Sequence, residues 1–427
     1  MAFIDLVWVD IFKDKKLGFI ANPGNIDAVK NKLPASISLI LLFLTLLFSF
    51  FPYITPFSFG TDIQPWSILM VTTYSMSLFY NGYRFQRIFI YLMIPMVFSI
   101  SLFYVGDNQF SSIRSIAGYF NIVLTPFVFY FILNKYYDLT INFLKLVVIT
   151  YLIIGLIQTV FDVNFLSLLL NRVSTFGGRG VTSLCPEPTF YGIVCLFLIL
   201  LFLTLDIKNK NLFICLLVFQ ILFISKSTMV ILLLLIFWFY YAIFKLNAKL
   251  FLLLFMFLII AMVIFITLDS SYYETRVLHL FNKLITNPES LINDGSINSR
   301  LGDVYFPIMG FIDNFGMPHG FGSFSNYQAT ELLKQDIFLH KAMPNDRIMS
   351  FYGGILFELG VIGLLIPISY SIILLRAYKK NIKNFLVFFF FLNTILFTAV
   401  PASLPLVGIY IAALLYRSDN SANVKYE

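Results

Sequence analysis

The stretch from Asp269 to Ser350 reads DSSYYETRVLHLFNKLITNPESLINDGSINSRLGDVYFPIMGFIDNFGMPHGFGSFSNYQATELLKQDIFLHKAMPNDRIMS. It contains no apolar run long enough to cross a bilayer, whereas the chain on either side is mostly long hydrophobic runs with short breaks. A connection of this length is uncommon unless it is functional or disordered. Apolar residues that argue against disorder are Phe306, Ile308, Phe311, Phe315, Phe321 and Phe324. The stretch therefore predicts a partly helical active-site or lid segment that lies over a membrane bundle.

The composition of the whole chain is that of a membrane protein. Of 427 residues, 59% are hydrophobic and only 12% are charged, and the mean hydropathy is +0.87. Soluble domains carry about 25% charged residues. We therefore predict an all-α polytopic membrane protein. The net charge of +7 gives no support for a nucleic-acid partner, because it mostly reflects lysines expected in cytoplasmic loops.

The hydropathy predicts about 12 transmembrane helices, since a span needs about 20 apolar residues. The candidate ranges are 35–52, 63–80, 88–105, 116–134, 142–161, 188–205, 211–224, 228–244, 250–268, 351–375, 384–399 and 402–416. An amphipathic, cytoplasmic or interfacial segment (1–34) precedes the first nine spans (35–268). A large periplasmic loop (269–350), three further spans (351–416) and a cytoplasmic tail (417–427) follow.

The distribution of basic residues predicts the orientation, because short cytoplasmic loops are enriched in Lys and Arg. With both termini in the cytoplasm, 15 lysines lie inside and four outside. The arginines divide differently, four inside and six outside. The outer arginines are Arg114, Arg172, Arg179, Arg276, Arg300 and Arg347. The planar guanidinium fork binds phosphate or carboxylate in bidentate fashion, although some of these residues, such as Arg114, are also suited to anchor helix ends at lipid headgroups.

A second outer segment, from Asn171 to Gly192, reads NRVSTFGGRGVTSLCPEPTFYG. Glycines surround Arg179, so the backbone there can approach a ligand closely. Glu187 lies between two prolines where the sixth predicted span begins. A carboxylate at a membrane edge is costly unless it faces a cavity or a partner. The alternative is that Glu187 is favoured there by the dipole of the helix that starts at Pro188.

Four pieces of the sequence resemble, in order, the motifs of Wzy-type O-antigen and capsular polysaccharide polymerases. They are GRGVTSLCPEPTFYG (178–192), with Thr189 in place of Ser; ISKS (224–227); Ser299-Arg300 with Gly320-Phe321-Gly322; and Asn345 with the run ELGVIG (358–363). The related O-antigen ligases usually show His-Asn at the last point. Here Pro344 precedes Asn345, and His340 lies five residues upstream.

The resemblance implies a membrane-embedded glycosyltransferase of the C-type class in the bacterial inner membrane. Its substrate would be an undecaprenyl-diphosphate-linked oligosaccharide repeat unit, polymerised on the outer face of that membrane into O-antigen or capsule. Such an enzyme would work in lipopolysaccharide or capsule biosynthesis beside a flippase and a chain-length regulator. A lipid diphosphate is an activated leaving group, so we expect no nucleotide or other cofactor.

The candidate catalytic residues follow from that chemistry. We expect Arg179 and Arg300 to stabilise the charge that develops on the diphosphate, with support from Lys226 or Arg347. Candidates for the general base that activates the acceptor hydroxyl are Glu187, His319 and His340. His319 is equally suited to a hydrogen-bonding role in its loop. We also expect Asn345 and Tyr305 to bind substrate, and no metal, because the outer segments show no acidic cluster with ligand spacing.

Two alternatives remain open. An O-antigen ligase would use the same donor with a different acceptor. A polysaccharide flippase or secondary transporter would belong to another class, in which ionisable residues often lie in mid-span and internal repeats are common. In this chain most predicted spans lack such residues, and the polar residues gather in the outer segments. That distribution favours catalysis.

Overall fold

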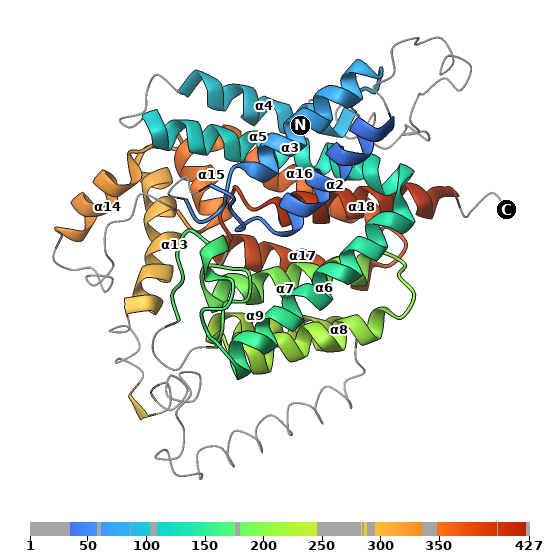
Figure 1. The fold of residues 1–427 in the computed structure, drawn as a ribbon. Helices are drawn as coiled ribbons and strands as arrows, with labels where there is room; N and C mark the ends of the chain where they lie inside the picture. The colour runs from blue at the N-terminus through green and yellow to red at the C-terminus, as the bar shows by residue number, and fades with distance from the viewer. Residues whose placement is uncertain are drawn as a thin grey trace.

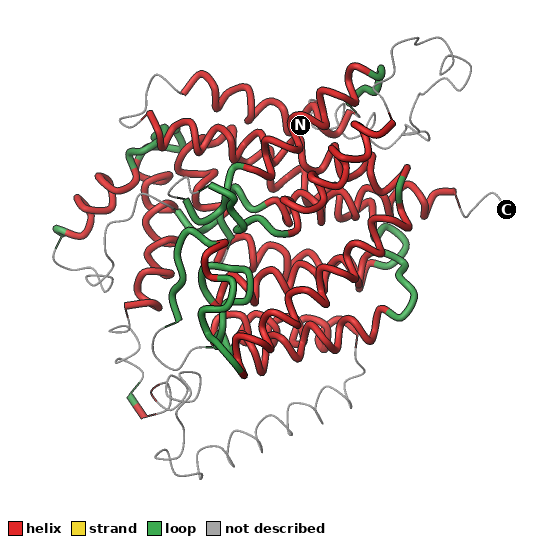
Figure 2. Tube along the Cα trace, in the orientation of Figure 1, coloured by secondary structure: helices red, strands yellow, loops and turns green. Residues whose placement is uncertain are grey.

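The computed structural model describes residues 35–57, 61–85, 87–102, 109–175, 180–245, 283, 286–287, 295–334, 348–398 and 400–423. Every regular element within these ranges is helical, which confirms the all-α prediction for this part of the chain (Figure 1; Figure 2). The predicted amphipathic segment 1–34 and the predicted span 250–268 lie outside the described residues.

Helices occupy the other eleven predicted ranges. They are α2 (Ala35–Phe50), α3 (Trp66–Tyr80), α4 (Arg87–Ser101), α5 (Gln109–Lys135), α6 (Tyr137–Val160), α7 (Pro188–Thr204), α8 (Lys210–Phe219) with η4 (Gln220–Ser225), α9 (Thr228–Lys245), α15 (Phe351–Leu359) with η6 (Gly360–Leu364) and α16 (Leu365–Ala377), α17 (Ile382–Thr398) and α18 (Pro405–Asn423). The predicted outer loop contributes α13 (Gly295–Asp313) and α14 (Phe324–Leu332).

The lengths and composition of these helices identify a helical membrane protein. Among the described residues, four helices are long and apolar enough to cross a bilayer: Ser112–Lys135, Tyr137–Val160, Thr228–Lys245 and Phe351–Ala377. Five further apolar helices are shorter than 18 residues. The part of the chain that the structure describes is therefore that of a helical membrane protein, in which four helices, and not twelve, are long and apolar enough to span a bilayer.

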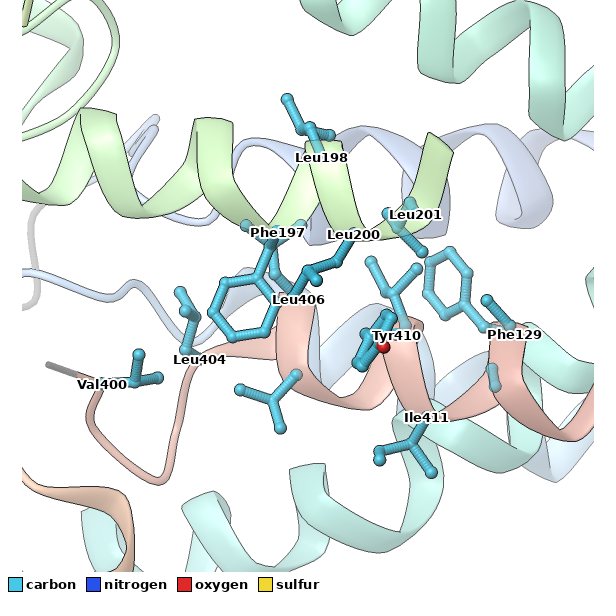
Figure 3. Packing of buried hydrophobic residues seen from close by; sticks show 14 of the residues in the cluster. Phe129, Phe197, Leu198, Leu200, Leu201, Val400, Leu404, Leu406, Tyr410 and Ile411 are labelled. Carbon is cyan, nitrogen blue, oxygen red and sulfur yellow. The ribbon is translucent and has the colours of Figure 1, made fainter. Parts of the chain in front are cut away.

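The centre of the bundle is formed by α5, α7 and α18. Nearly every residue of α7 is buried, as expected for a helix that is apolar on all sides. Figure 3 shows Phe197 and Leu200 of α7 meeting Leu406 and Tyr410 of α18, and all four side chains are at most 1% exposed. This close packing fixes the starts of α5 and α7 relative to the connection that precedes α18.

Connections that the sequence predicts to lie outside gather at one end of the bundle. The loops before α3, α7 and α18 meet there with the starts of α5 and α15. Figure 2 shows the loop before α7 beside α13, and Figure 1 shows α13 and α14 at the same side of the molecule.

The helices α5, α9 and α16 carry a basic residue in their last turn, where the helix dipole favours a cation.

The outer segment buries part of its predicted apolar surface. Phe306 and Phe321 are fully buried, and Phe324 is 3% exposed. Phe315 is 94% exposed, in a left-handed turn that ends α13. Backbone hydrogen bonds join this turn to the end of α15, from Val361 N to the Gly316 carbonyl (2.9 Å) and from His319 N to the Phe357 carbonyl (3.0 Å).

Candidate active site

A cavity of about 370 Å³ lies where the outer connections meet. Its walls come from four parts of the chain that are distant in sequence: residues 61–69, 113–121, 348–358 and 401–403, with Phe190 of α7. Asn121 Nδ2 donates to the Ser403 carbonyl (2.8 Å) and so joins two of these walls. Ligand pockets in proteins commonly have volumes of about 300–1,000 Å³, so this cavity is large enough for part of a substrate.

Part of the cavity lining is apolar. Leu69 and Ile113 line it and still leave 47% and 58% of their surfaces exposed. Both belong to helices of the membrane bundle, α3 and α5. The cavity lining therefore includes side chains that are also exposed on the apolar surface of the bundle.

Three charged residues line the polar side: Asp62, Arg114 and Glu358. Glu358, in the last turn of α15, accepts hydrogen bonds from Ser115 Oγ (2.9 Å, to Oε1) and Tyr119 Oη (2.7 Å, to Oε2). The charge of Arg114 acts on the same carboxylate. Both oxygens of Glu358 are thus oriented by neutral hydroxyl donors of α5.

Asp62 belongs to an ion-pair cluster at the edge of the cavity. Arg172 Nε lies 2.7 Å from Asp62 Oδ1, and Arg172 Nη2 lies 2.9 Å from Asp62 Oδ2 and 2.9 Å from Glu187 Oε1. Hydrogen bonding to Asp62 is the main reason that the pKa of Arg172 is raised above its already high ordinary value. Glu187 is the N-cap residue of α7, but its side chain makes no capping hydrogen bond and pairs with Arg172 instead.

Arg300 of α13 borders the same region. Its guanidinium carbon lies 5.9 Å from the centroid of the Phe190 ring, and Phe190 lines the cavity. Its Nη1 is buried and has no hydrogen-bond partner in the part of the chain that the structure describes. Such an unsatisfied buried donor is rare in native structures and calls for an acceptor. The Tyr53 ring packs against Phe190 with 5.5 Å between the ring centroids, and among the described residues its buried hydroxyl has no hydrogen-bond partner.

One turn after Arg300, Asp303 is almost fully buried. Burial raises the pKa of Asp303 to about 7, although the charge of Arg300 and a hydrogen bond from the Met349 backbone both act to lower it. Met349 lines the cavity. Asp303 therefore links α13 to the wall of the cavity just before α15.

Two of the motif pieces contact each other directly. Ser225 Oγ donates to the Pro188 carbonyl (2.7 Å), and Ser227 Oγ to Thr189 Oγ1 (3.1 Å). A Cβ on Gly180 would lie 2.0 Å from the Ile224 carbonyl oxygen, so only glycine fits. Lys226 lies between the two serines in a left-handed turn (φ 46°) that ends the π-helical segment η4. Its turn is therefore held against the start of α7, next to Glu187.

His319 and Tyr305 lie elsewhere. His319 Nε2 is 2.8 Å from the Gly310 carbonyl oxygen, and its ring stacks on Phe357 with centroids 4.3 Å apart and planes within 1°. Neither it nor Tyr305 lines the cavity; Tyr305 packs beside Phe306 in a small aromatic cluster. This geometry favours the hydrogen-bonding role of His319 over that of a general base.

The remaining candidates, Arg179, His340, Asn345 and Arg347, lie outside the described residues. Within the residues that the structure places, no group of three or more His, Cys, Asp and Glu side chains has the spacing of a metal site.

Sequence reasoning missed Asp62, Arg172 and Glu358 as site residues. It also treated Arg114 as suited to a headgroup anchor, whereas Arg114 lines the cavity. The signals were available: Arg114 and Arg172 belong to the excess of outer arginines, and Glu358 begins the run ELGVIG. What the sequence did not show is which of these residues meet.

A comparison of the chain with protein-family models and with curated proteins finds no match.

Proposed function

We propose that this protein is a membrane-embedded glycosyltransferase. It transfers a growing glycan from undecaprenyl diphosphate to a sugar hydroxyl of another lipid-linked repeat unit, and so polymerises O-antigen or capsular polysaccharide. The observation that supports this proposal is the cavity at one end of an apolar bundle, with Arg114, Asp62 and Glu358 on its polar side and Leu69 and Ile113 on its apolar side.

The charges suit a diphosphate leaving group. As the glycosidic bond breaks, negative charge builds up on the diphosphate, and fixed donors stabilise it without reorganisation. Arg114 on the cavity and Arg300 beside Phe190 are the arginines in place for this role. The buried, unpartnered Nη1 of Arg300 has a donor to offer such an oxygen. Arg179, Arg347 and Lys226 remain candidates for the same task.

The apolar side suits the other part of the substrate. A polyprenyl chain is as hydrophobic as the acyl chains around it, and it need not leave the bilayer if the cavity opens on a lipid-facing surface. The exposed parts of Leu69 and Ile113 provide such a surface. The diphosphate and the first sugars would then enter among the polar connections.

The proposal includes the location. Twelve spans in the bacterial inner membrane, both termini in the cytoplasm and the cavity on the outer face would place the site where lipid-linked repeat units are exposed. A flippase and a chain-length regulator of the same pathway are the expected partners.

An O-antigen ligase is the nearest alternative, since it differs only in the acceptor. A transporter is less well supported, because Asp62, Arg172 and Glu187 lie in the connections at one end of the bundle, whereas transport sites typically lie near the bilayer midplane.

The test is a reconstituted reaction. The purified protein in lipid nanodiscs is given undecaprenyl-diphosphate-linked repeat units, and products are separated by length. We expect a ladder of polymers from the wild type. Arg300→Lys and Arg300→Ala should both lose roughly a hundredfold or more in rate, because Lys keeps the charge but not the fork. Arg84→Lys, at an exposed site in the turn between α3 and α4, is the matched control.

The outcomes separate the classes. Transfer to a lipid A-core acceptor without a ladder identifies a ligase. Passage of repeat units across vesicle membranes with no new glycosidic bond identifies a transporter. A full ladder from Arg300→Lys at normal yield would contradict the role of that arginine.

A further inference from the structure

Glu358 differs from the other two acidic residues near the mouth of the cavity. Asp62 and Glu187 are both paired with Arg172, whose guanidinium engages both oxygens of Asp62 and Oε1 of Glu187. Glu358 receives one hydroxyl hydrogen bond on each oxygen. A carboxylate oxygen has two lone-pair sites, so each oxygen of Glu358 keeps one site for a further donor.

The local backbone presents this side chain to the cavity. α15 stops at Leu359 because Gly360 adopts φ 62°, and the chain continues as a 3₁₀ turn. A Cβ at Gly360 would lie 2.3 Å from the Gly316 carbonyl oxygen, so the break depends on glycine. On the opposite side, Ser115 and Tyr119 lie one turn apart on α5 and both face Glu358.

We propose that Glu358 is the general base that accepts the proton of the acceptor hydroxyl, and that Ser115 and Tyr119 are positioning residues that hold it. This assignment rests on the proposed glycosyl transfer. It replaces the earlier candidates Glu187, which pairs with Arg172 and does not line the cavity, and His319, which is stacked on Phe357 outside the cavity.

The O–H bond of the acceptor breaks and its proton passes to a free lone pair of Glu358. The acceptor oxygen forms the new bond to the anomeric carbon. The bond from that carbon to the diphosphate oxygen breaks, and its electron pair leaves with the lipid diphosphate beside Arg114. The proton on Glu358 then passes to water at the polar mouth of the cavity.

The first test compares Glu358→Gln with the matched control Glu331→Gln, a glutamate of α14 that pairs with Lys334 away from the cavity. Turnover and donor binding are measured on the full-length protein in nanodiscs. We expect Glu358→Gln to lose at least a hundredfold in turnover while the binding of radiolabelled lipid-linked donor is unchanged, and Glu331→Gln to behave as wild type. Polymerisation by Glu358→Gln at a rate close to wild type would overturn the assignment and leave the proposed function intact.

The second test is chemical rescue, which a purely structural role would not show. Glu358→Ala leaves space for a small carboxylate, so added formate should restore turnover by roughly tenfold or more and have no effect on wild type. Tyr119→Phe should lower kcat by roughly tenfold with little change in KM, and should add nothing in the Glu358→Gln background. If the glutamate variants do not fold, an unchanged kcat in Tyr119→Phe overturns the proposal. Absence of any glycosidic product from the wild type would instead reject the proposed function itself, and the assignment with it.

Discussion

Arg172 binds Asp62 through two guanidinium nitrogens, with Nε 2.7 Å from Oδ1 and Nη2 2.9 Å from Oδ2. The pair joins the connection before α3 to the connection before α7, and Nη2 also reaches Glu187. Because Asp62 lines the cavity, the position of one wall depends on an arginine 110 residues further along the chain.

The geometry of this cluster predicts that Arg172→Lys is not conservative. A lysine can satisfy one carboxylate oxygen but cannot bridge both oxygens of Asp62 and also reach Glu187. We expect the rate of polymerisation to fall roughly tenfold to a hundredfold through misplacement of the wall. Glu187→Gln should have a much smaller effect, since an amide oxygen still accepts from Nη2. Chain-length analysis at matched protein levels measures both; equal losses in the two variants would argue for a direct catalytic role of Glu187.

The two possible roles of Arg114, as a headgroup anchor and as a cavity residue, predict different results for its replacement by lysine. An anchor would tolerate Lys, because Lys snorkels equally well. A cavity arginine that contacts a diphosphate would not, and we expect Arg114→Lys to cost roughly a hundredfold in rate. Arg84→Lys, which lies away from the cavity, should be silent. If Arg114→Lys made as much polymer as the wild type, Arg114 would be a headgroup anchor.

Asp303 makes stability depend on pH. Burial raises its pKa in the folded protein from the ordinary value of 3.8 to about 7. The folded state therefore holds this proton more tightly than the unfolded state. The stability contributed by the protonated form is complete below about pH 4 and is lost as the pH rises through about 7.

We expect Asp303→Asn, which stays neutral, to flatten the pH dependence of the unfolding temperature between pH 5 and pH 8. The variant should melt above the wild type at pH 8. In a domain of 150–250 residues each kcal/mol moves Tm by about 2–4 °C, and somewhat less in a larger chain, so thermal unfolding in detergent can resolve the effect. If the unfolding temperatures of wild type and variant changed with pH in parallel, Asp303 would have the same pKa in the folded and unfolded states.

A single methyl group at Gly360 should be strongly destabilising. Its φ of 62° is unfavourable for other residues, and a Cβ would lie 2.3 Å from the Gly316 carbonyl oxygen. We expect Gly360→Ala to cost more than about 2 kcal/mol. Gly354→Ala in the same helix is the control, because its Cβ would meet only Ile348, at 3.7 Å; its Tm should be unchanged or slightly higher. Similar melting of both variants would show that the break after α15 tolerates a side chain.

Much of the fold was predictable because hydropathy is a local property. The sequence predicted a helix at each of the eleven ranges that can be compared, for example at 188–205, where α7 runs from Pro188 to Thr204. A hydrophobic run of residues does not show whether the helix that it forms crosses the membrane. Pro188–Thr204 is shorter than a typical span, and whether it spans depends on tilt and on its neighbours.

The site was less predictable, because its members come together only through packing. Glu358 was visible as the first residue of a motif, but its hydroxyl donors lie 243 and 239 residues away. Nothing in the sequence marked Asp62 as a site residue beyond its position just before the predicted span 63–80. His319 drew attention because histidine is rare here, yet Phe357, on which its ring stacks, lies 38 positions further along the chain.

The exposed apolar wall formed by Leu69 and Ile113 affects how activity should be measured. A substrate that arrives from that side diffuses in two dimensions, so the relevant quantity is its mole fraction among the surrounding lipids and not its molar concentration in the tube. Diluting the membrane with inert phospholipid would slow such a reaction even at a constant total amount of substrate. Rates from vesicles of different lipid loading are therefore comparable only when expressed per area of bilayer.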